Sequence, residues 1–347
     1  MESEIKLTFQ PYTLQLKHTF TVSSYSRKET PAVLTEIEYD DVVGYGEASM
    51  PQYLGESQDS VIRFLSKVDL SNFKDPTDVQ NILYYIDSLE EGNNAAKASV
   101  DIALHDLVGK LMNIPLYKYF KLNYPEGLYT SYTIGIDTKE MIKKKIDEAE
   151  GFKYLKIKLG RQHDKETIEY IRSQTDTPLF VDVNQGWKDK YKALEMIEWL
   201  AEKNIILIEQ PLPKEDLDGI GWLTENSPLP VIADEAVWRV KDLPLVKDFY
   251  SGINIKLMKS TGLYEANLMI RQAKELGLKI MLGCMTETSC AVTAMAHLAS
   301  QADWLDLDGP LLINNDVFEG LSYKKGRIEI NDSPGIGLVK KSRQSRN

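Results

Sequence analysis

Histidine and cysteine are scarce in this chain. Among 347 residues there are four histidines and only two cysteines, Cys284 and Cys290. Two cysteines cannot form a disulfide framework, so we expect a reducing, cytoplasmic compartment. None of the histidines stands at the end of a predicted strand, which argues against a zinc centre.

Long apolar runs and an excess of positive charge are also absent. No apolar stretch approaches the length that crosses a membrane, and the N-terminal segment MESEIKLTFQ has no apolar signal core. The formal net charge is −11, which disfavours binding to nucleic acid. We therefore expect neither a membrane nor a nucleic-acid partner, while a homo-oligomer is compatible with the sequence.

Two patterns of apolar residues divide the chain. Three alternating stretches within residues 5–48 are typical of strands, with Asp40 and Asp41 suited to a tight hairpin, and helical periodicity follows. Lys97, His105 and Asp106 fall on a helix there and are interpreted as surface or satisfied positions. After Thr130, strand-like stretches alternate with helical ones. Eight such stretches occur: SYTIGI, KYLKIKL, LFVDVNQ, IILIEQP, PVIADEA, GINIKLM, KIMLGCM and ADWLDLD.

This order predicts an α/β fold, a (β/α)₈ (modified TIM) barrel with an α+β capping domain. A doubly wound open sheet is the alternative, but no Gly-rich turn follows the first strand, at GIDTKE. We expect the capping domain at 1–125 and the barrel at 126–310. The segment 311–347 is expected to return to the capping domain.

Charged residues stand at the ends of consecutive predicted strands, where a barrel has its active site. From Lys158 to Asp182 is 24 positions, and the steps on to Glu209, Asp234 and Lys256 are 27, 25 and 22. Singly, the acids could be helix N-caps and the lysines solvent-facing. Since each step is one βα unit, a closed barrel would bring all five around one pocket.

The carboxylates of Asp182, Glu209 and Asp234 would repel each other if they were buried without a partner. A divalent cation removes that repulsion, and all-oxygen ligation favours magnesium, manganese or calcium. Mg²⁺ is the expected cofactor, because it would keep positions open for a substrate carboxylate or water.

Lys158 and Lys256 fall on the second and sixth predicted strands, which are opposite in a ring of eight. A carbon held between them would have one amine on each face, the layout for moving a proton from one face of a planar intermediate to the other. Burial and a nearby metal would lower the pKa of both lysines toward working pH.

These strand ends resemble the enolase superfamily, in particular its muconate-lactonising subgroup, over nearly the whole chain. The matching motifs are KIKLG, VDVNQGW, IEQPL, ADEA and NIKLMKSTG. The resemblance implies that the three carboxylates hold magnesium, that Lys158 and Lys256 are the acid/base catalysts, and that Lys156 helps to neutralise the enolate. The paired glycines often seen after the sixth-strand lysine are missing, and no histidine stands on the seventh strand, unlike in some dehydratases.

The eighth predicted strand points to one activity within the subgroup. Asp306-Leu307-Asp308 resembles the Asp-x-Asp with which dipeptide epimerases bind the free ammonium of the substrate. Arg27, in the segment TVSSYSRKET, matches the place where L-Ala-D/L-Glu epimerases can carry an arginine for the Glu side chain. Besides this segment, the loop MPQYLGE is expected to form a second loop over the pocket.

The expected function is that of an isomerase, a dipeptide epimerase. It would transfer a proton at the α-carbon of the C-terminal residue of a dipeptide, with L-Ala-D/L-Glu from peptidoglycan turnover as the expected substrate. The o-succinylbenzoate synthases, N-acylamino acid racemases and muconate cycloisomerases of the subgroup are alternatives. A barrel that only binds a metal-chelated peptide is a different class, against which Lys158 and Lys256 argue, since binding alone needs neither.

Overall fold

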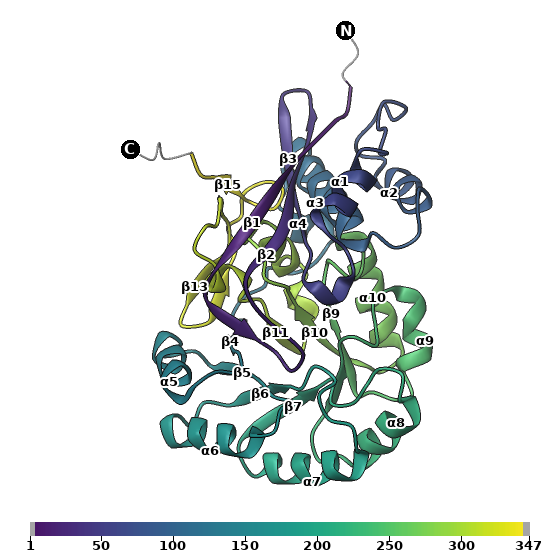
Figure 1. Cartoon of the computed structure of the whole chain (residues 1–347). Helices are drawn as coiled ribbons and strands as arrows, with labels where there is room; N and C mark the ends of the chain where they lie inside the picture. The colour runs from purple at the N-terminus through teal and green to yellow at the C-terminus, as the bar shows by residue number, and fades with distance from the viewer. Residues whose placement is uncertain (1–3, 343–347) are drawn as a thin grey trace.

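The computed structural model describes residues 4–342, which form a capping part above a ring of parallel strands (Figure 1). The capping part begins with an antiparallel sheet in the order β1-β2-β3. Asp40 and Asp41, both at positive φ (49° and 61°), make the tight turn between β2 and β3, which confirms the predicted hairpin. The elements of the capping part are β1 (Lys6–Thr21), β2 (Ser26–Tyr39), β3 (Val42–Ser49), η1 (Gln52–Leu54), α1 (Gln58–Leu65), α2 (Val79–Ser88), α3 (Asn94–Leu111) and α4 (Leu116–Tyr119).

The second part is an eight-stranded parallel sheet in which every strand pairs with its neighbours in chain order. A parallel bridge between Thr130 and Leu305 joins the last strand to the first, so the sheet closes. This closure confirms the predicted barrel and is at odds with an open doubly wound sheet. The strands are β4 (Ser131–Ile134), β5 (Tyr154–Lys158), β6 (Leu179–Asp182), β7 (Ile205–Glu209), β8 (Val231–Ala233), β9 (Gly252–Ile255), β10 (Lys279–Gly283) and β11 (Trp304–Asp306).

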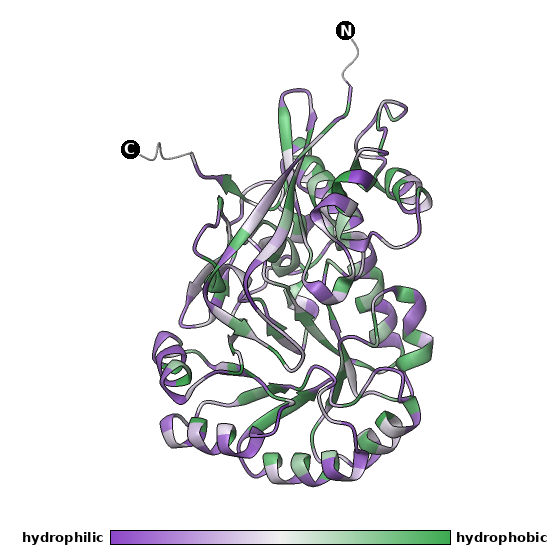
Figure 2. Ribbon diagram, in the orientation of Figure 1, coloured by the Kyte–Doolittle hydropathy of each residue, from purple (hydrophilic) through white to green (hydrophobic). Residues whose placement is uncertain are grey.

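Helices surround the strands on the outside of the ring (Figure 1), and their apolar faces turn toward the strands (Figure 2). Apolar burial on this inner face is what holds each amphipathic helix in place. Among the described residues, no helix combines the length and the apolar character that a membrane span requires. The helices are α5 (Lys139–Glu148), α6 (Asp164–Gln174), α7 (Lys190–Ala201), α8 (Leu217–Asn226), η2 (Val240–Asp242), α9 (Leu243–Val246), α10 (Leu263–Glu275), α11 (Ser289–Ala296), η3 (Ala299–Gln301) and η4 (Gly309–Leu312).

The segment after the barrel lies against the capping part. A bridge pairs Ile313 with Leu16, and another pairs Gly335 with Pro115. These contacts agree with a chain that returns to the first domain, while the boundaries at 125/126 and 310/311 stay a prediction. The short strands of this last segment are β12 (Phe318–Glu319), β13 (Ser322–Lys324), β14 (Arg327–Glu329) and β15 (Val339–Lys340).

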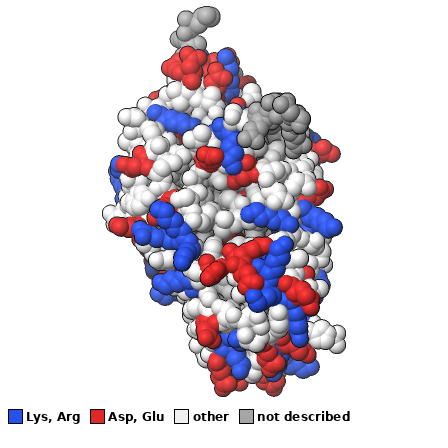
Figure 3. All heavy atoms as spheres, turned by 90° about the vertical axis from the view of Figure 1, so that its left-hand side faces the viewer, with Lys and Arg blue, Asp and Glu red and all other residues white. Residues whose placement is uncertain are grey.

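Helix α3 is the centre of the capping part, and its residues from Asn94 to Gly109 are buried. It packs on β2, β3 and α10, so it lies between the capping sheet and the barrel. Lys97, His105 and Asp106 are therefore buried and paired, so they are satisfied positions, one of the two interpretations from the sequence, and not surface ones. Outside, on the face shown in Figure 3, acidic and basic side chains are interspersed.

Candidate active site

Alternation along the barrel strands positions the site. Phe180, Leu207 and Ile232 fill the barrel interior together with Met281. Two residues further along each strand, side chains return to the same face. That face therefore carries Asp182 after Phe180, Glu209 after Leu207 and Asp234 after Ile232, so an apolar layer supports a carboxylate layer.

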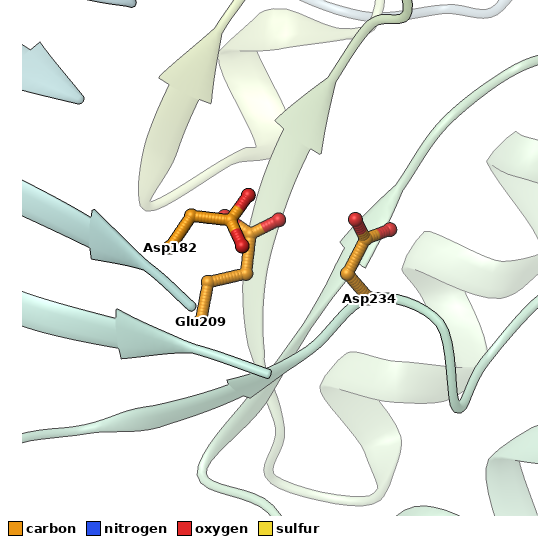
Figure 4. Close-up of side chains that lie close together, drawn as sticks. All are labelled: Asp182, Glu209 and Asp234. Carbon is orange, nitrogen blue, oxygen red and sulfur yellow. The ribbon is translucent and has the colours of Figure 1, made fainter. Parts of the chain in front are cut away.

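The three carboxylates converge, with Asp182 beside Glu209 and Asp234 facing them (Figure 4). One oxygen from each lies within 4.8 Å of the others, and the three side chains are buried. Burial and the charge of Asp182 raise the pKa of Glu209 to about 7. Its Oε2 atom, 2.7 Å from Lys156 Nζ, accepts no well-directed hydrogen bond among residues 4–342. This buried all-oxygen set fits a divalent cation such as Mg²⁺.

Lys158 and Lys256 reach this cluster from opposite sides of the barrel, since β5 and β9 are four places apart in the ring of eight. Lys158 Nζ lies 2.5 Å from Asp182 Oδ2, and Lys256 Nζ lies 2.7 Å from Asp234 Oδ2. Burial lowers the pKa of Lys256, but the charge of Asp234 outweighs it and the pKa is raised. The expected lowering of this pKa rests on burial together with the charge of a bound metal, so it stays a prediction.

The eighth strand brings two more acids to the site. Asp306 Oδ2 accepts a hydrogen bond from Lys156 Nζ at 2.7 Å, and its Oδ1 accepts one from Ser131 at 2.8 Å. Asp308 accepts one from the backbone N–H of Thr133 at 2.6 Å. Burial and the charge of Asp306 raise the pKa of Asp308 to about 7, so a cation placed beside the pair would favour its ionised form.

Arg27 lies on β2, near the tip of the hairpin that reaches over the barrel (Figure 1). Its guanidinium donates to Thr30, Tyr25 and Thr286, at 2.8–3.0 Å, and lies over the ring of Phe20. Within residues 4–342 it forms no ion pair. The side chain is therefore a cation held in place by neutral groups.

A cavity of about 510 Å³ joins these groups, and its wall includes Pro51 and Tyr53 of the second predicted loop. Asp182 and Glu209 are buried at the site without lining the cavity. Seven of the nine predicted site residues do line it: Arg27, Lys156, Lys158, Asp234, Lys256, Asp306 and Asp308.

Three further residues at the site were given no role in the prediction. Asn254 donates to Glu209 Oε1 at 2.9 Å, and Lys259 Nζ lies 2.6 Å from Asp234 Oδ1. Both occur in the motif NIKLMKSTG, where Asn254 shares the strand face of Lys256. Glu235 lines the cavity, and burial together with the charge of Asp234 raises its pKa to about 8. Its place next to Asp234 in ADEA was the only signal in the sequence.

Two family descriptions match the chain in succession. "Mandelate racemase / muconate lactonizing enzyme, N-terminal domain" matches residues 5–120, and "Enolase C-terminal domain-like" matches residues 140–343. The chain belongs to the mandelate racemase/muconate lactonizing enzyme family of the enolase superfamily. This membership agrees with the closed barrel and its capping part.

Within this family, several proteins are similar over almost their whole length. An L-Ala-D/L-Glu epimerase of Bacteroides thetaiotaomicron is 55% identical over 97% of this chain and 88% of its own. A substrate-liganded L-Ala-D/L-Glu epimerase from Bacillus subtilis superposes with a TM-score of 0.92 at 30% identity, covering 98% and 99% of the two chains. A dipeptide epimerase from Enterococcus faecalis, complexed with Mg and L-Leu-L-Tyr, superposes with a TM-score of 0.89 at 30% identity. The match covers 96% of this chain and 99% of the other.

Proposed function

We propose that this protein is an L-Ala-D/L-Glu epimerase, with magnesium held by Asp182, Glu209 and Asp234. The observation that carries the proposal is the pair Lys158 and Lys256, which approach one carboxylate cluster from opposite sides of a closed barrel. The 55% identical relative of that name supports the choice of substrate. We further propose a cytoplasmic role in peptidoglycan turnover.

The mechanism follows from the placement of the side chains. Mg²⁺ would supply charge stabilisation for the substrate carboxylate as the α-proton leaves. Lys158 and Lys256 hold or receive that proton at Nζ on opposite faces of the α-carbon, so one removes it and the other returns a proton to the other face. Lys156 adds a positive charge for the developing anion.

The remaining residues orient the dipeptide. Asp306 and Asp308 lie at one wall of the cavity, where a free N-terminal ammonium would pair with them. Arg27 would pair with the side-chain carboxylate of the C-terminal residue, because it is a fixed cation without an acidic partner in the part of the chain that the structure describes. These contacts favour a substrate with one ammonium and two carboxylates.

The direct test is incubation of L-Ala-L-Glu with the protein and Mg²⁺ in D₂O. We expect one deuterium at the α-carbon of Glu, measured by mass spectrometry. We also expect conversion to L-Ala-D-Glu, measured by chiral chromatography. N-acetylation removes the ammonium and should lower kcat/KM by roughly 30-fold or more, since a lost buried charge pair costs on the order of 2–5 kcal/mol. No deuterium uptake would refute the epimerase, and equal efficiency of both substrates would favour an N-acylamino acid racemase.

A second prediction concerns Arg27. Arg27→Ala should lower kcat/KM for L-Ala-L-Glu by roughly 10-fold or more and change that for L-Ala-L-Leu little, because only Glu offers the arginine a carboxylate. Arg161→Ala is the matched control: Arg161 donates to the carbonyls of Val22 and Ser23 on the same hairpin but does not line the cavity. An equal loss on both dipeptides would show that Arg27 only orders the hairpin.

A further inference from the structure

Lys158 and Lys256 are supported differently by the fold. Lys158 is the last residue of β5 and is paired in register with Asp182 of β6. Lys256 is the first residue beyond β9, on a loop that ends at Gly262 before α10 begins. Hydrogen bonds of the sheet therefore set the backbone of Lys158, whereas the backbone of Lys256 depends on what holds the β9–α10 loop, residues 256–262.

The far end of that loop is held by a carboxylate from the other domain. Asp101 of α3 accepts hydrogen bonds from the backbone N–H groups of Leu263 at 2.5 Å and Tyr264 at 3.1 Å, the first two residues of α10. These N–H groups have no partner within their helix, and the N-cap residue Gly262 has no side chain to serve them. The negative charge of a carboxylate is also favourable at this end of a 13-residue helix.

The packing between Gly262 and Asp101 leaves no room for a side chain at position 262. Gly262 has φ of +114°, and a Cβ atom placed there would lie 2.3 Å from Asp101 Cγ. Both the backbone conformation and the close approach require glycine at this position. Asp101 itself is 1% exposed, and its carboxylate lies between the start of α10 and His105, whose Nδ1 is 3.2 Å from Oδ1.

Two more contacts hold the middle of the loop. Asn94, at the start of α3, donates to the carbonyl of Lys259 at 2.8 Å. From the barrel side, Lys259 Nζ donates to the carbonyl of Asp234 at 2.6 Å. The loop is therefore fixed between α3 and Asp234. By contrast, the N–H groups of Gly160 and Arg161, which follow Lys158, are bound by Asp164 at the start of their own helix α6.

We propose that Asp101 is a positioning residue for Lys256. By binding the start of α10 it fixes the β9–α10 loop and, through it, the Nζ atom that faces the α-carbon. The capping domain thus holds the backbone at the start of α10, beyond Lys256. After Lys158 the backbone N–H groups are bound by Asp164 of the barrel, and the capping domain accepts hydrogen bonds there from the side chain of Arg161. This inference rests on the proposed function, which assigns the proton transfers to Lys158 and Lys256.

The test measures α-proton exchange in D₂O separately for the two epimers of the dipeptide. Lys256→Ala first identifies the epimer whose exchange depends on Lys256. Asp101→Asn keeps one acceptor oxygen and loses the other, and it should slow exchange of that epimer by on the order of 10-fold, since a small misplacement of a reacting group is costly. Exchange of the other epimer should change by less than about twofold. Gly262→Ala, which disturbs the same contact from the barrel side, should show the same preference.

Asp106→Asn is the matched control. Asp106 is an equally buried carboxylate on α3, but it accepts from the backbone N–H groups of Tyr45 and Ile336 and contacts no residue of the loop. The Asp106→Asn substitution should lower the melting temperature. It should slow α-proton exchange of both epimers equally, or of neither.

Three results separate the inference from the proposed function. If the unmodified protein exchanges both epimers and Asp101→Asn and Gly262→Ala slow them equally or not at all, the positioning role is wrong. Should Asp101→Asn fail to fold, Gly262→Ala decides the same question. If the unmodified protein exchanges neither epimer, the proposed function is wrong and the inference falls with it.

Discussion

Replacing either Lys158 or Lys256 by alanine should stop epimerisation of the dipeptide in both directions. Each direction needs one group to take the proton and another to return one on the opposite face, and a positioned acid or base contributes roughly 10²–10⁴-fold. Exchange of the α-proton with solvent needs only one base. Lys158→Ala should therefore retain exchange for one epimer and Lys256→Ala for the other, as measured by NMR or mass spectrometry in D₂O.

The control for removing a buried lysine is Lys97→Ala. Lys97 pairs with Asp87 in the capping domain at 2.8 Å, so its loss should lower stability without abolishing epimerisation. The opposed-lysine mechanism would be wrong if both active-site variants exchanged the same epimer. It would also be wrong if one variant exchanged both epimers at the rate of the unmodified protein.

Removal of divalent ions should abolish turnover, and Mg²⁺ should restore it. The reason is the cluster of three buried carboxylates, whose mutual repulsion and facing oxygens suit a divalent ion. Glu209→Gln replaces one anionic oxygen by a neutral amide and should weaken Mg²⁺ binding by at least on the order of 10-fold, measured by calorimetry on the folded variant.

Glu287→Gln serves as the comparison for that variant. Glu287 is also buried, but it accepts a hydrogen bond from the backbone N–H of Met285 and does not line the cavity. Its replacement should leave the affinity for Mg²⁺ unchanged. Full activity in excess chelator, after the loss of metal has been verified, would contradict a role for the ion.

Much of the site could be predicted because strand periodicity is local. Side chains two positions apart share a face, so Asp182 must lie on the same face of its strand as Phe180, and Glu209 on the same face as Leu207. The βα spacing then assigns them to equivalent strand ends. Motifs such as KIKLG and ADEA carry the family resemblance without any knowledge of contacts.

The sequence by itself thus determined the barrel, the family and seven of the residues that line the cavity. Only the tertiary structure decided how those residues are held and charged. Asp101 binds Leu263, which is 162 positions away in the sequence, and Arg27 binds Thr286, which is 259 positions away. No local sequence pattern therefore predicts either contact. The pKa of Lys256 likewise depends on its distance to Asp234 on another strand, because electrostatic interactions follow separation in space and not position along the chain.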